Sequence, residues 1–531
     1  MRSSLWSLAE RPGNQFEVSS IDGRVSIGEI LRSAVELSEF LGKEKGRNGS
    51  GLVAIACTHP VATVISLMAA TRVRWPFALV DPAGLGYIEE KIADLPVTVV
   101  LCDQGEVSFA RRCIGQSCIS SDRGAFVNVS AYGASSGHRL RYECGYDVDD
   151  EEAGLPIVFS TSGASATGRW VVHTEASLWA SVESKIDGMA RFGRLERTSD
   201  IKRLIDAVIE RPRAVGISLS SISGYTQLLH CIAIGVPLAI GSGLLPRQMV
   251  RLAQQSRAGT LVVTPTMLQL MLLVCSRLNA EFPYMGLIGV GGGRLDPHIA
   301  FEAETRFGAR IIQGYGSTEL GGAVTNGRIY DSPDVRCGTV GRALGGVEIE
   351  IRRQDGGVAS RGEVGEVVVR APNRFARGYL SGSDRARIVA LEMRDDAYWT
   401  GDVGLIREDQ NLVLLGRSDG RVTRSDQTFS LEDVEEVLEA HARVVRAVVR
   451  AEESEFKLRI VARCEMSEGV GVPASELMAW CRQRLSRPQC PDVIELGPVS
   501  MTVTGKKVFQ RPGQQTAEID RHGDGGENAL R

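Results

Sequence analysis

Leu52-Val-Ala-Ile-Ala-Cys57 is a short apolar run rich in strand-forming residues, and the pattern around it decides the fold. His59 to Met68 follow with the apolar spacing of a helix, and Phe77-Ala-Leu-Val80 is a second apolar run. Short buried strands separated by helices are typical of doubly wound parallel sheets. We therefore predict an α/β fold in which helices cover both faces of each sheet.

The alternation of strands and helices continues to about residue 300 and predicts two doubly wound sheets. Further apolar runs lie at Val97–Leu101, Pro156–Phe159, Gly259–Val263 and Gly286–Val290. After about residue 338 the pattern changes to alternating runs with glycine-rich turns between them, as in Val347–Ile351. This second pattern predicts a small antiparallel, barrel-like β unit over about residues 338–416.

The last part of the chain predicts a compact α+β unit. A helix is expected at Leu431–His441, strands at Val444–Arg450 and Leu458–Cys464, and a helix at Ala474–Leu485. We place the domain boundaries at 1–416, 417–511 and a polar tail at 512–531, which we expect to be disordered. The Gly/Ser-rich and acidic stretch Ala131–Gly154 is predicted to be a solvated loop.

Composition excludes several classes of protein. The chain has 531 residues, 43% hydrophobic and 24% charged, with a net charge of −4. This balance gives no electrostatic footprint for nucleic acid or for an anionic membrane surface. The 11 cysteines are scattered and never form CxxC, which predicts free thiols in a reducing, cytoplasmic location. The two most apolar stretches, Leu228–Leu245 and Leu261–Cys275, contain proline and are expected to be buried strand–helix units.

A loop of small residues follows the expected strand that ends at Phe159. It reads Ser-Thr-Ser-Gly-Ala-Ser-Ala-Thr-Gly from Ser160 to Gly168. Small residues let backbone N–H groups and hydroxyls converge on an anion. The spacing of its glycines is that of a P-loop, but Arg169 and Trp170 stand where a P-loop needs Lys and Ser/Thr. A Ser/Gly linker is the alternative for this segment.

A second glycine-rich segment is Gln313-Gly-Tyr-Gly-Ser-Thr-Glu319. An aromatic ring between two glycines can lie flat against a base, a threonine hydroxyl can donate to a phosphate, and a carboxylate can hold a metal ion. In isolation, an ordinary glycine-rich turn explains the segment as well.

Two later segments could also carry chemistry. Tyr398-Trp-Thr-Gly-Asp402, with Gly416-Arg-Ser-Asp419 after it, can accept hydrogen bonds from a ribose diol, although a capped turn is the alternative. Thr504-Gly-Lys-Lys507 can bring a mobile positive charge to a phosphoryl group, or can be a solvated basic turn. Only 8 of the 61 basic residues are lysines, so two adjacent lysines are unusual in this chain and favour a specific role.

In this order and spacing the four segments resemble the adenylate-forming superfamily: acyl- and aryl-CoA synthetases, luciferases and the adenylation domains of peptide synthetases. The resemblance covers about residues 5 to 511. It implies a ligase that uses ATP and Mg²⁺ to convert a carboxylic acid to an acyl-adenylate. The acyl group then passes to a thiol, either coenzyme A or the pantetheine of an acyl carrier protein.

The resemblance also implies a role for individual residues. Lys506 would bridge the acid and the α-phosphate, Thr318 would touch that phosphate, Glu319 would hold Mg²⁺, and Asp419 would be the hinge of a mobile C-terminal domain. The nucleotide-binding residues would be Thr161, Ser162, Gly163, Ser165, Gly291, Gly292, Gly293, Gly314, Tyr315, Gly316, Thr318, Asp402 and Arg417.

Two departures from the family pattern bear on function. The phosphate loop of the family reads Thr-Ser-Gly-Thr-Thr-Gly-x-Pro-Lys-Gly, and here Ala164, Ala166, Gly168, Arg169 and Trp170 replace five of its positions. We expect an altered grip on pyrophosphate rather than a loss of activity. After the hinge, Thr423 and Asp426 stand where the family often has Lys and Gly. This difference puts a carboxylate near the thiol channel.

The acid is expected to be uncharged and non-amino, because Gly216–Thr226 lacks the aspartate with which amino-acid adenylation domains hold an amine. Small residues are expected to line its pocket and leave room for a bulky or long-chain acid: Ser218, Ser221, Ser223, Gly224, Gly291, Gly292 and Gly314. A carboxylate nucleophile needs no general base, so we expect His173 to be structural.

Three functions remain open from the sequence: an acyl-CoA synthetase, an acyl-AMP ligase that loads a carrier protein or stops at the adenylate, and a non-catalytic nucleotide-binding relative. The expected partners are a small carboxylic acid and, in the second case, an acyl carrier protein. We expect no nucleic acid and no membrane span, and the chain could be a monomer or a homodimer.

Overall fold

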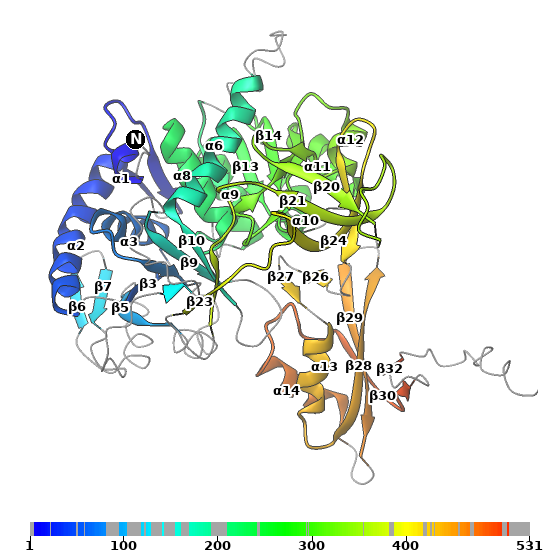
Figure 1. The fold of residues 1–531 in the computed structure, drawn as a ribbon. Coiled ribbons are helices and arrows are strands. Elements are labelled where there is room, and N and C mark those ends of the chain that lie inside the picture. Colours follow the sequence, from blue (N-terminus) through cyan, green and yellow to red (C-terminus); the bar gives the residue numbers. More distant parts are fainter. Residues whose placement is uncertain are drawn as a thin grey trace, which may run out of the picture. The chain divides into compact units, whose positions relative to one another are not determined.

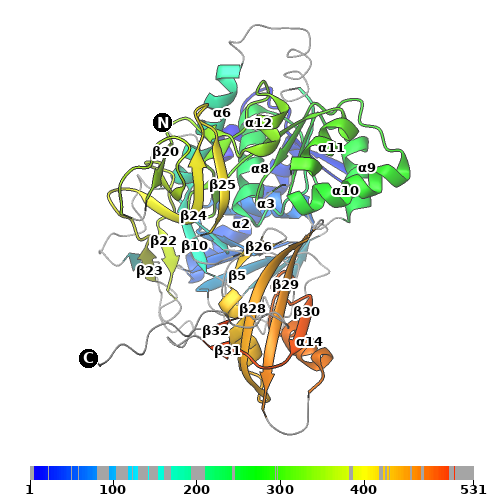
Figure 2. The same ribbon diagram turned by 90° about the vertical axis from the view of Figure 1, so that its right-hand side faces the viewer.

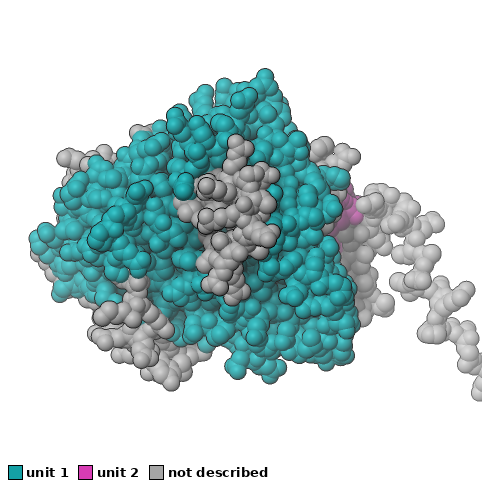
Figure 3. Space-filling model, turned by 90° about the horizontal axis from the view of Figure 1, so that it is seen from above, with its two compact units in different colours: residues 1–428 teal, residues 429–531 magenta. Residues whose placement is uncertain are grey.

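The computed structural model divides into two compact units, residues 1–428 and 429–531 (Figure 3). Each unit has sheets and helices of its own. The structure describes residues 5–21, 23–48, 51–57, 59–80, 95–102, 118–121, 124–128, 141–142, 154–160, 169–192, 210–241, 245–293, 295, 297–353, 355–381, 387–417, 422–424, 427–429, 431–454, 457–467, 472–501 and 507–508.

The first sheet of residues 1–428 has seven strands in the order β15-β14-β13-β11-β12-β1-β2. All pairs from β15 to β1 are parallel, and only β2 is antiparallel. Strands β11 to β15 are short and mostly buried, as expected for a parallel sheet covered on both faces. The strands are β1 (Glu17–Ser20), β2 (Gly23–Ser26), β11 (Arg213–Val215), β12 (Leu238–Ile240), β13 (Thr260–Val263), β14 (Leu287–Val290) and β15 (Arg310–Gln313).

Helices cover both faces of this sheet because successive strand residues point to opposite sides. Ala214 packs in one core cluster with residues of α9, α10 and α11, whereas Val215 packs in the other cluster with residues of α8. Figure 2 shows α9, α10 and α11 side by side. The helices are α8 (Ile222–Ile234), α9 (Pro246–Gln255), α10 (Pro265–Leu278) and α11 (Pro297–Phe307).

Local sequence sets the ends of α8 and α10. The hydroxyl of Ser221 accepts a hydrogen bond from the Gly224 N–H and caps the start of α8, and Gly235 ends that helix at a φ of 71°. Thr264 caps α10 in the same way and Pro265 occupies its first turn. These caps fix the start of α10 directly after β13 and the start of α8 shortly after β11.

The second sheet has ten strands in the order β6-β7-β5-β3-β4-β9-β10-β22-β23-β8. Its central pairs β5-β3, β3-β4 and β4-β9 are parallel, as predicted. The pairs on either side of this centre are antiparallel, except for the parallel pair β23-β8 at one edge. β9 turns back through β10, which pairs with β22 from much later in the chain. The strands are β3 (Leu52–Ala56), β4 (Phe77–Leu79), β5 (Val97–Cys102), β6 (Cys118–Ser121), β7 (Gly124–Asn128), β8 (Arg141–Tyr142), β9 (Pro156–Ser160), β10 (Trp170–Thr174), β22 (Gly378–Leu380) and β23 (Arg387–Ala390).

One continuous core joins the ten-stranded sheet to α8. Phe77 and Phe159 from the sheet, Trp75 just before β4 and Tyr225 from α8 are at most 1% exposed. The rings of Phe159 and Tyr225 meet edge to face at 5.5 Å. The helices that contribute to this core are α1 (Leu5–Ala9), α2 (Ile27–Asn48), α3 (Pro60–Arg72) and α6 (Glu175–Phe192).

An antiparallel sheet forms the small β unit that the sequence predicts, while its bounds at about residues 338–416 stay a prediction. Its strands are ordered β20-β21-β24-β25, and Val367, Val369, Ile351 and Leu412 form its core. The bounds of its elements and of the short ones beside it are β16 (Gly316–Ser317), β17 (Gly322–Ala323), β18 (Thr325–Asn326), α12 (Pro333–Gly338), β19 (Arg342–Ala343), β20 (Glu348–Arg352), β21 (Gly365–Arg370), β24 (Tyr398–Ile406) and β25 (Leu412–Arg417).

Residues 429–531 contain a three-stranded sheet, β28-β29-β30, with α13 and α14 packed beside it (Figure 1). The two long strands and both helices lie where the sequence predicts them. The elements are α13 (Leu431–Glu439), β28 (Val444–Ser454), β29 (Lys457–Met466), α14 (Ala474–Arg482), β30 (Val493–Leu496), β31 (Ser500–Met501) and β32 (Lys507–Val508), and the pair β26 (Val422–Arg424) and β27 (Gln427–Phe429) lies at the boundary of the two units.

The mixed α/β fold class is thus confirmed, while the domain boundary at 416/417 stays a prediction. The expected solvated loop lies almost wholly, and the expected disordered tail wholly, outside the described residues. In the portion of the chain that is described, no helix combines the length and the apolar character needed to cross a membrane.

Candidate active site

The predicted glycine segments meet at one edge of the seven-stranded sheet. β14 ends at Val290 directly before Gly291–Gly293, and β15 ends at Gln313 directly before Gly314. Val290 pairs with Gln313, and the Gly314 N–H donates to the Val290 carbonyl at 2.9 Å. Because the strands are parallel, their carboxyl ends share this edge, which is where open α/β sheets bind ligands.

Close backbone approach explains why residues 314–316 contain two glycines. A Cβ on Gly316 would lie 2.0 Å from the Gly322 carbonyl oxygen, and one on Gly314 would lie 3.3 Å from the Thr325 carbonyl oxygen. Only glycine fits at position 316 without moving the chain. These two glycines hold Tyr315 between the sheet edge and the short pair β16/β17.

Tyr315 and Asp402 lie together although 87 residues separate them. The Tyr315 hydroxyl donates to Asp402 Oδ2 at 2.5 Å, and the Tyr315 N–H donates to Thr325 Oγ1 at 3.1 Å. Tyr315 is 9% exposed and packs in the core of the β unit. The structure therefore joins the predicted base-binding and ribose-binding residues in one cluster.

Backbone and side-chain bonds also fix the turn at Asp402. The Asp402 N–H donates to Thr400 Oγ1 at 3.0 Å, and the Gly401 N–H donates to Glu366 Oε1 at 3.1 Å. Asp402 on β24 pairs through the backbone with Arg417 on β25, which puts the two predicted ribose-binding residues opposite each other. Glu366 is not among the site residues predicted from the sequence.

Glu319 is linked to the ten-stranded sheet through Tyr379. The Tyr379 hydroxyl donates to Glu319 Oε1 at 3.0 Å, and the guanidinium of Arg169 lies over the Tyr379 ring at 5.2 Å. Burial and the nearby Glu319 charge raise the pKa of Tyr379 to about 12, so the phenol stays protonated and keeps donating. Arg169, which replaces the lysine of the family's loop, thus lies beside the predicted metal ligand.

His173 holds the backbone of Thr318. Its Nε2 lies 2.7 Å from the Thr318 carbonyl oxygen and its Nδ1 lies 2.9 Å from Ser177 Oγ. Burial lowers the pKa of His173 to about 4, although the bond to Thr318 opposes that shift. The imidazole is therefore neutral at pH 7, and both ring nitrogens have partners. This arrangement favours the structural role expected for His173.

The predicted acid-pocket residues at the start of α8 have local structural roles. Ser221 Oγ donates to the Ser218 carbonyl at 2.7 Å besides capping the helix. A Cβ on Gly224 would lie 2.0 Å from the same carbonyl oxygen. Ser223 is partly exposed, and its carbonyl accepts from Thr226 Oγ1. Whether these residues also contact the acid stays a prediction.

Several predicted residues lie outside the described parts of the chain: Thr161, Ser162, Gly163 and Ser165 of the phosphate loop, the hinge residue Asp419, Asp426 and Lys506. The strands that flank the phosphate loop are described. Ser160 at the end of β9 pairs with Trp170 at the start of β10. The two ends of the predicted loop are therefore fixed side by side.

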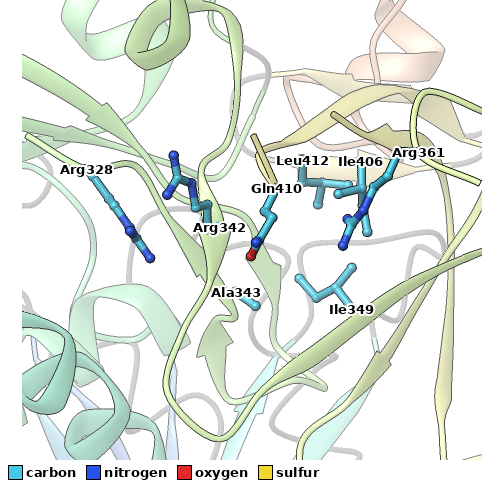
Figure 4. Close-up of a pocket in the computed structure, with 8 residues that line it drawn as sticks. All are labelled: Arg328, Arg342, Ala343, Ile349, Arg361, Ile406, Gln410 and Leu412. Carbon is cyan, nitrogen blue, oxygen red and sulfur yellow. The ribbon is translucent and has the colours of Figure 1, made fainter. Parts of the chain in front are cut away.

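A separate cavity of about 270 Å³ lies at the opposite end of the β24–β25 hairpin from Asp402 (Figure 4). Its charged lining is three arginines, of which Arg342 lies 3.4 Å from the Asp331 carboxylate and Arg361 is exposed. Sequence reasoning did not identify this cavity. Its lining residues are Arg328, Arg342, Ala343, Ile349, Arg361, Ile406, Gln410 and Leu412.

Comparisons with known proteins agree with this fold. A family model described as AMP-binding enzyme matches residues 6–380. The chain is 26% identical over 338 residues to a 2-succinylbenzoate–CoA ligase of Geobacillus kaustophilus, which covers 64% of each protein. It is 28% identical over 222 residues to a long-chain-fatty-acid–CoA ligase of Yersinia pestis, which covers 41% of this chain and 38% of that protein. These matches span less than two thirds of the relatives' lengths.

Among solved structures, the amide bond synthetase McbA from Marinactinospora thermotolerans aligns with a TM-score of 0.74 at 21% identity, over 95% of this chain and 98% of that one. At this identity the likeness establishes a shared fold alone. The family model, together with this fold, identifies an adenylate-forming type of protein. Because the family model matches well over half of its residues, this chain belongs to the AMP-binding enzyme family.

Proposed function

We propose that this chain activates a bulky or long-chain non-amino carboxylic acid with ATP and transfers the acyl group to a thiol, with coenzyme A as the first candidate. The observation that carries the proposal is the Tyr315–Asp402 hydrogen bond of 2.5 Å at the edge where Gly291–Gly293 also lie. This cluster combines an aromatic ring, a carboxylate and exposed glycine backbone, which suit adenine, ribose and phosphate.

In the first step, a carboxylate oxygen of the acid attacks the α-phosphorus of ATP. A new P–O bond forms while the bond to the pyrophosphate oxygen breaks, so acyl-AMP and pyrophosphate are the products. Such a displacement depends on positioning and charge neutralisation rather than on covalent help from the protein. We assign Thr318 to the α-phosphate, Thr161–Ser165 to the outer phosphates, and Lys506 to the bridge between acid and phosphate.

Glu319 is the residue proposed to hold Mg²⁺. In the described part of the chain, no group of three or more metal-binding side chains occurs. Mg²⁺ commonly binds through one or two carboxylates together with substrate phosphates, and a single carboxylate fits that mode. Tyr379 bonds only Oε1, and among the described residues Oε2 makes no hydrogen bond. A bound Mg²⁺ would neutralise charge on the phosphates.

In the second step, the thiol attacks the acyl carbon, a C–S bond forms and AMP leaves. We expect the C-terminal unit to rotate about Asp419 between the steps, and the family resemblance supports this expectation. Asp426 bears on the acceptor, because a carboxylate near the channel would repel the phosphates of coenzyme A. Asp426 therefore supports the alternative of an acyl-AMP ligase that loads a carrier protein.

Asp426 also supports an amine as a second candidate acceptor. A carboxylate would attract a cationic amine and could accept its proton, and attack by the nitrogen would give an amide and AMP. The activity named for McbA, amide bond synthesis, is chemistry of this kind. A non-catalytic nucleotide-binding relative is the remaining alternative.

The test is pyrophosphate release from ATP with a panel of carboxylic acids, followed by product analysis with coenzyme A, a phosphopantetheinylated carrier protein, or a primary amine. An acyl-CoA product supports the first candidate, and an amide or acylated carrier supports the others. ATP binding without pyrophosphate release for any acid would leave only the non-catalytic alternative.

A further inference from the structure

Inside residues 1–428, four basic residues lie near one another, and none of these four has an acidic partner in the described part of the chain: Lys185, Arg213, His230 and Arg374. Arg213, His230 and Arg374 are 5%, 3% and 2% exposed, and Lys185 is partly buried. They come from α6, β11, α8 and the segment after β21, and α6 and α8 pack side by side (Figure 1). We call these four residues the buried basic cluster.

Arg213 and His230 leave two donors without acceptors. Arg213 Nη1 donates to Gln227 Oε1 at 2.7 Å and to His230 Nδ1 at 2.6 Å. Because Nδ1 accepts, the neutral His230 ring carries its proton on Nε2. Among the described residues, neither this Nε2 nor the Nε of Arg213 has a hydrogen-bond partner. Both donors are therefore available to an anion.

Lys185 and Arg374 add positive charge to the same region. Arg374 donates to Ser181 Oγ at 3.2 Å and to the Ala323 carbonyl at 2.5 Å, and its Nη1 has no partner among the described residues. Lys185 lies one turn after Ser181 on α6. Burial lowers the pKa of Lys185 to about 7, and the charges of Arg213 and Arg374 add to that shift.

Burying these positive charges without an acidic partner lowers the stability of the folded chain when no ligand is bound. Moving an unpaired cation out of water costs several kcal/mol, and each buried donor without an acceptor adds to that cost. No acidic side chain forms an ion pair with any member of the cluster within the described ranges. Apolar residues at these positions would stabilise the fold better than unpaired charges do. The charges therefore point to an anionic ligand.

Two α8 side chains of this region, Gln227 and His230, contact Arg213. Ser223, Gln227 and His230 are spaced i, i+4 and i+7, which places them on one side of a helix. Ser223 and Gln227 are partly exposed, whereas Gly224 to Thr226 between them are buried. At about 1.5 Å per residue, His230 is roughly 10 Å from Ser223 along the axis. Arg374 bonds Ala323, which pairs with Gly316.

We propose that the acid activated by this chain carries a second carboxylate, which binds to Arg213, His230 and Lys185 at the far end of the acid pocket. The proposal rests on the proposed function and names its substrate class, a dicarboxylic acid. This substrate class differs from the uncharged acid expected from Gly216–Thr226 alone. The missing aspartate in that segment argues against an amine on the substrate but does not argue against a second carboxylate.

The test compares matched acids in the pyrophosphate-release assay: hexanoate with adipate, octanoate with suberate, and decanoate with sebacate. We expect the diacid to have the higher kcat/KM in the longer pairs, by about tenfold or more. Preference for the monoacid in every pair would overturn the inference while leaving the proposed function intact.

Two variants test the residues. Arg213→Gln keeps an amide beside Gln227 and removes the charge, and Lys185→Met removes a charge that its neighbours repel, so this variant should fold even if the first does not. Each should lower the diacid-to-monoacid ratio of kcat/KM about tenfold. Arg361→Gln, at the surface cavity, is the matched control and should leave the ratio unchanged. Equal ratios in all four proteins would overturn the inference.

A binding measurement separates this inference from the proposed function. If no acid releases pyrophosphate, the proposed function fails, and the thermal shift with ATP and each acid then decides the inference. A diacid that raises the Tm of the wild-type chain more than its monoacid partner does, and loses that effect in Lys185→Met, supports the second carboxylate site. No difference between the paired acids would overturn it.

Discussion

The surface cavity and the buried basic cluster both contain several basic residues, yet their surroundings differ. At the cavity, Arg342 faces the Asp331 carboxylate at 3.4 Å and Arg361 is exposed to water. In the cluster, Arg213 and Arg374 are at most 5% exposed and have no acidic partner among the described residues. Water and carboxylates neutralise the first group, and nothing in the described part of the chain neutralises the second.

This difference teaches that arginine count alone does not identify a ligand site. Exposed ion pairs contribute little to stability, because water solvates the charges about as well as the partner does. Buried charges without a partner lower stability and persist only where another role maintains them. The same comparison ranks the effects expected from substitutions.

The largest effect on activity is expected at Lys506, a basic residue that belongs to neither group and that we assign to the reacting acid and phosphate. Lys506→Ala should lower the rate of adenylation by about a hundredfold to a thousandfold, because a charge at the transition state is lost. Thiolation of acyl-adenylate made beforehand should be nearly unaffected if the C-terminal unit rotates. Single-turnover assays of the two half-reactions check this, and equal damage to both would contradict the rotation.

A smaller effect is expected at the end of the β24–β25 hairpin opposite the cavity. Asp402→Asn keeps the size of the side chain but removes the charge that accepts from Tyr315, so the KM for ATP should rise about tenfold. The KM for the acid should change much less. Glu408→Gln, an exposed position near the turn of the same hairpin, serves as the control. A shift of both KM values by the same factor would argue against nucleotide binding at Asp402.

Lys185 tests the energetic cost of the cluster. Its pKa falls from the ordinary value of 10.5 to about 7 on folding, so the unfolded chain binds this proton more tightly. The resulting loss of stability grows as the pH falls from 10.5 towards 7 and is complete below that. Lys185→Met should therefore raise the free energy of unfolding by about 1 kcal/mol at pH 6 and by less at pH 9. Urea unfolding at the two pH values measures this, and a gain that is larger at pH 9 would refute it.

The smallest effect is expected at the cavity. Arg361→Gln should change the free energy of unfolding by less than about 0.5 kcal/mol and leave the rate of pyrophosphate release as it is, because the side chain is exposed. Thermal unfolding measures the change in stability, and the pyrophosphate assay measures the rate. A clear loss of activity would mean that the cavity arginines, like those of the buried basic cluster, take part in function.

The sequence predicted most of the fold because the strands are locally distinct. Leu52–Cys57 and Gly286–Val290 were predicted within a residue of β3 and β14. The strand β10 was missed, because Trp170–Thr174 follow the phosphate loop and only pairing with β9 and β22 makes them a strand. Pairing between residues about 200 positions apart leaves no local pattern to read.

In the candidate site, too, local motifs could be predicted from the sequence and contacts between distant segments could not. The glycines and the tyrosine at 314–316 were visible as a motif, whereas the bond between Tyr315 and Asp402 depends on two distant elements. The buried basic cluster was missed for the same reason. One signal was present: Lys185 is among only 8 lysines in the chain, where arginine is otherwise used.

The β9–β10 hairpin has a practical consequence for engineering. Since Ser160 and Trp170 are paired neighbours, any segment placed between them starts and ends at the same two anchor points. The residues from Thr161 to Gly168 can thus be exchanged as a cassette. Placing the family's Thr-Ser-Gly-Thr-Thr-Gly sequence there would measure how the altered loop changes nucleotide affinity, without redesigning the rest of the protein.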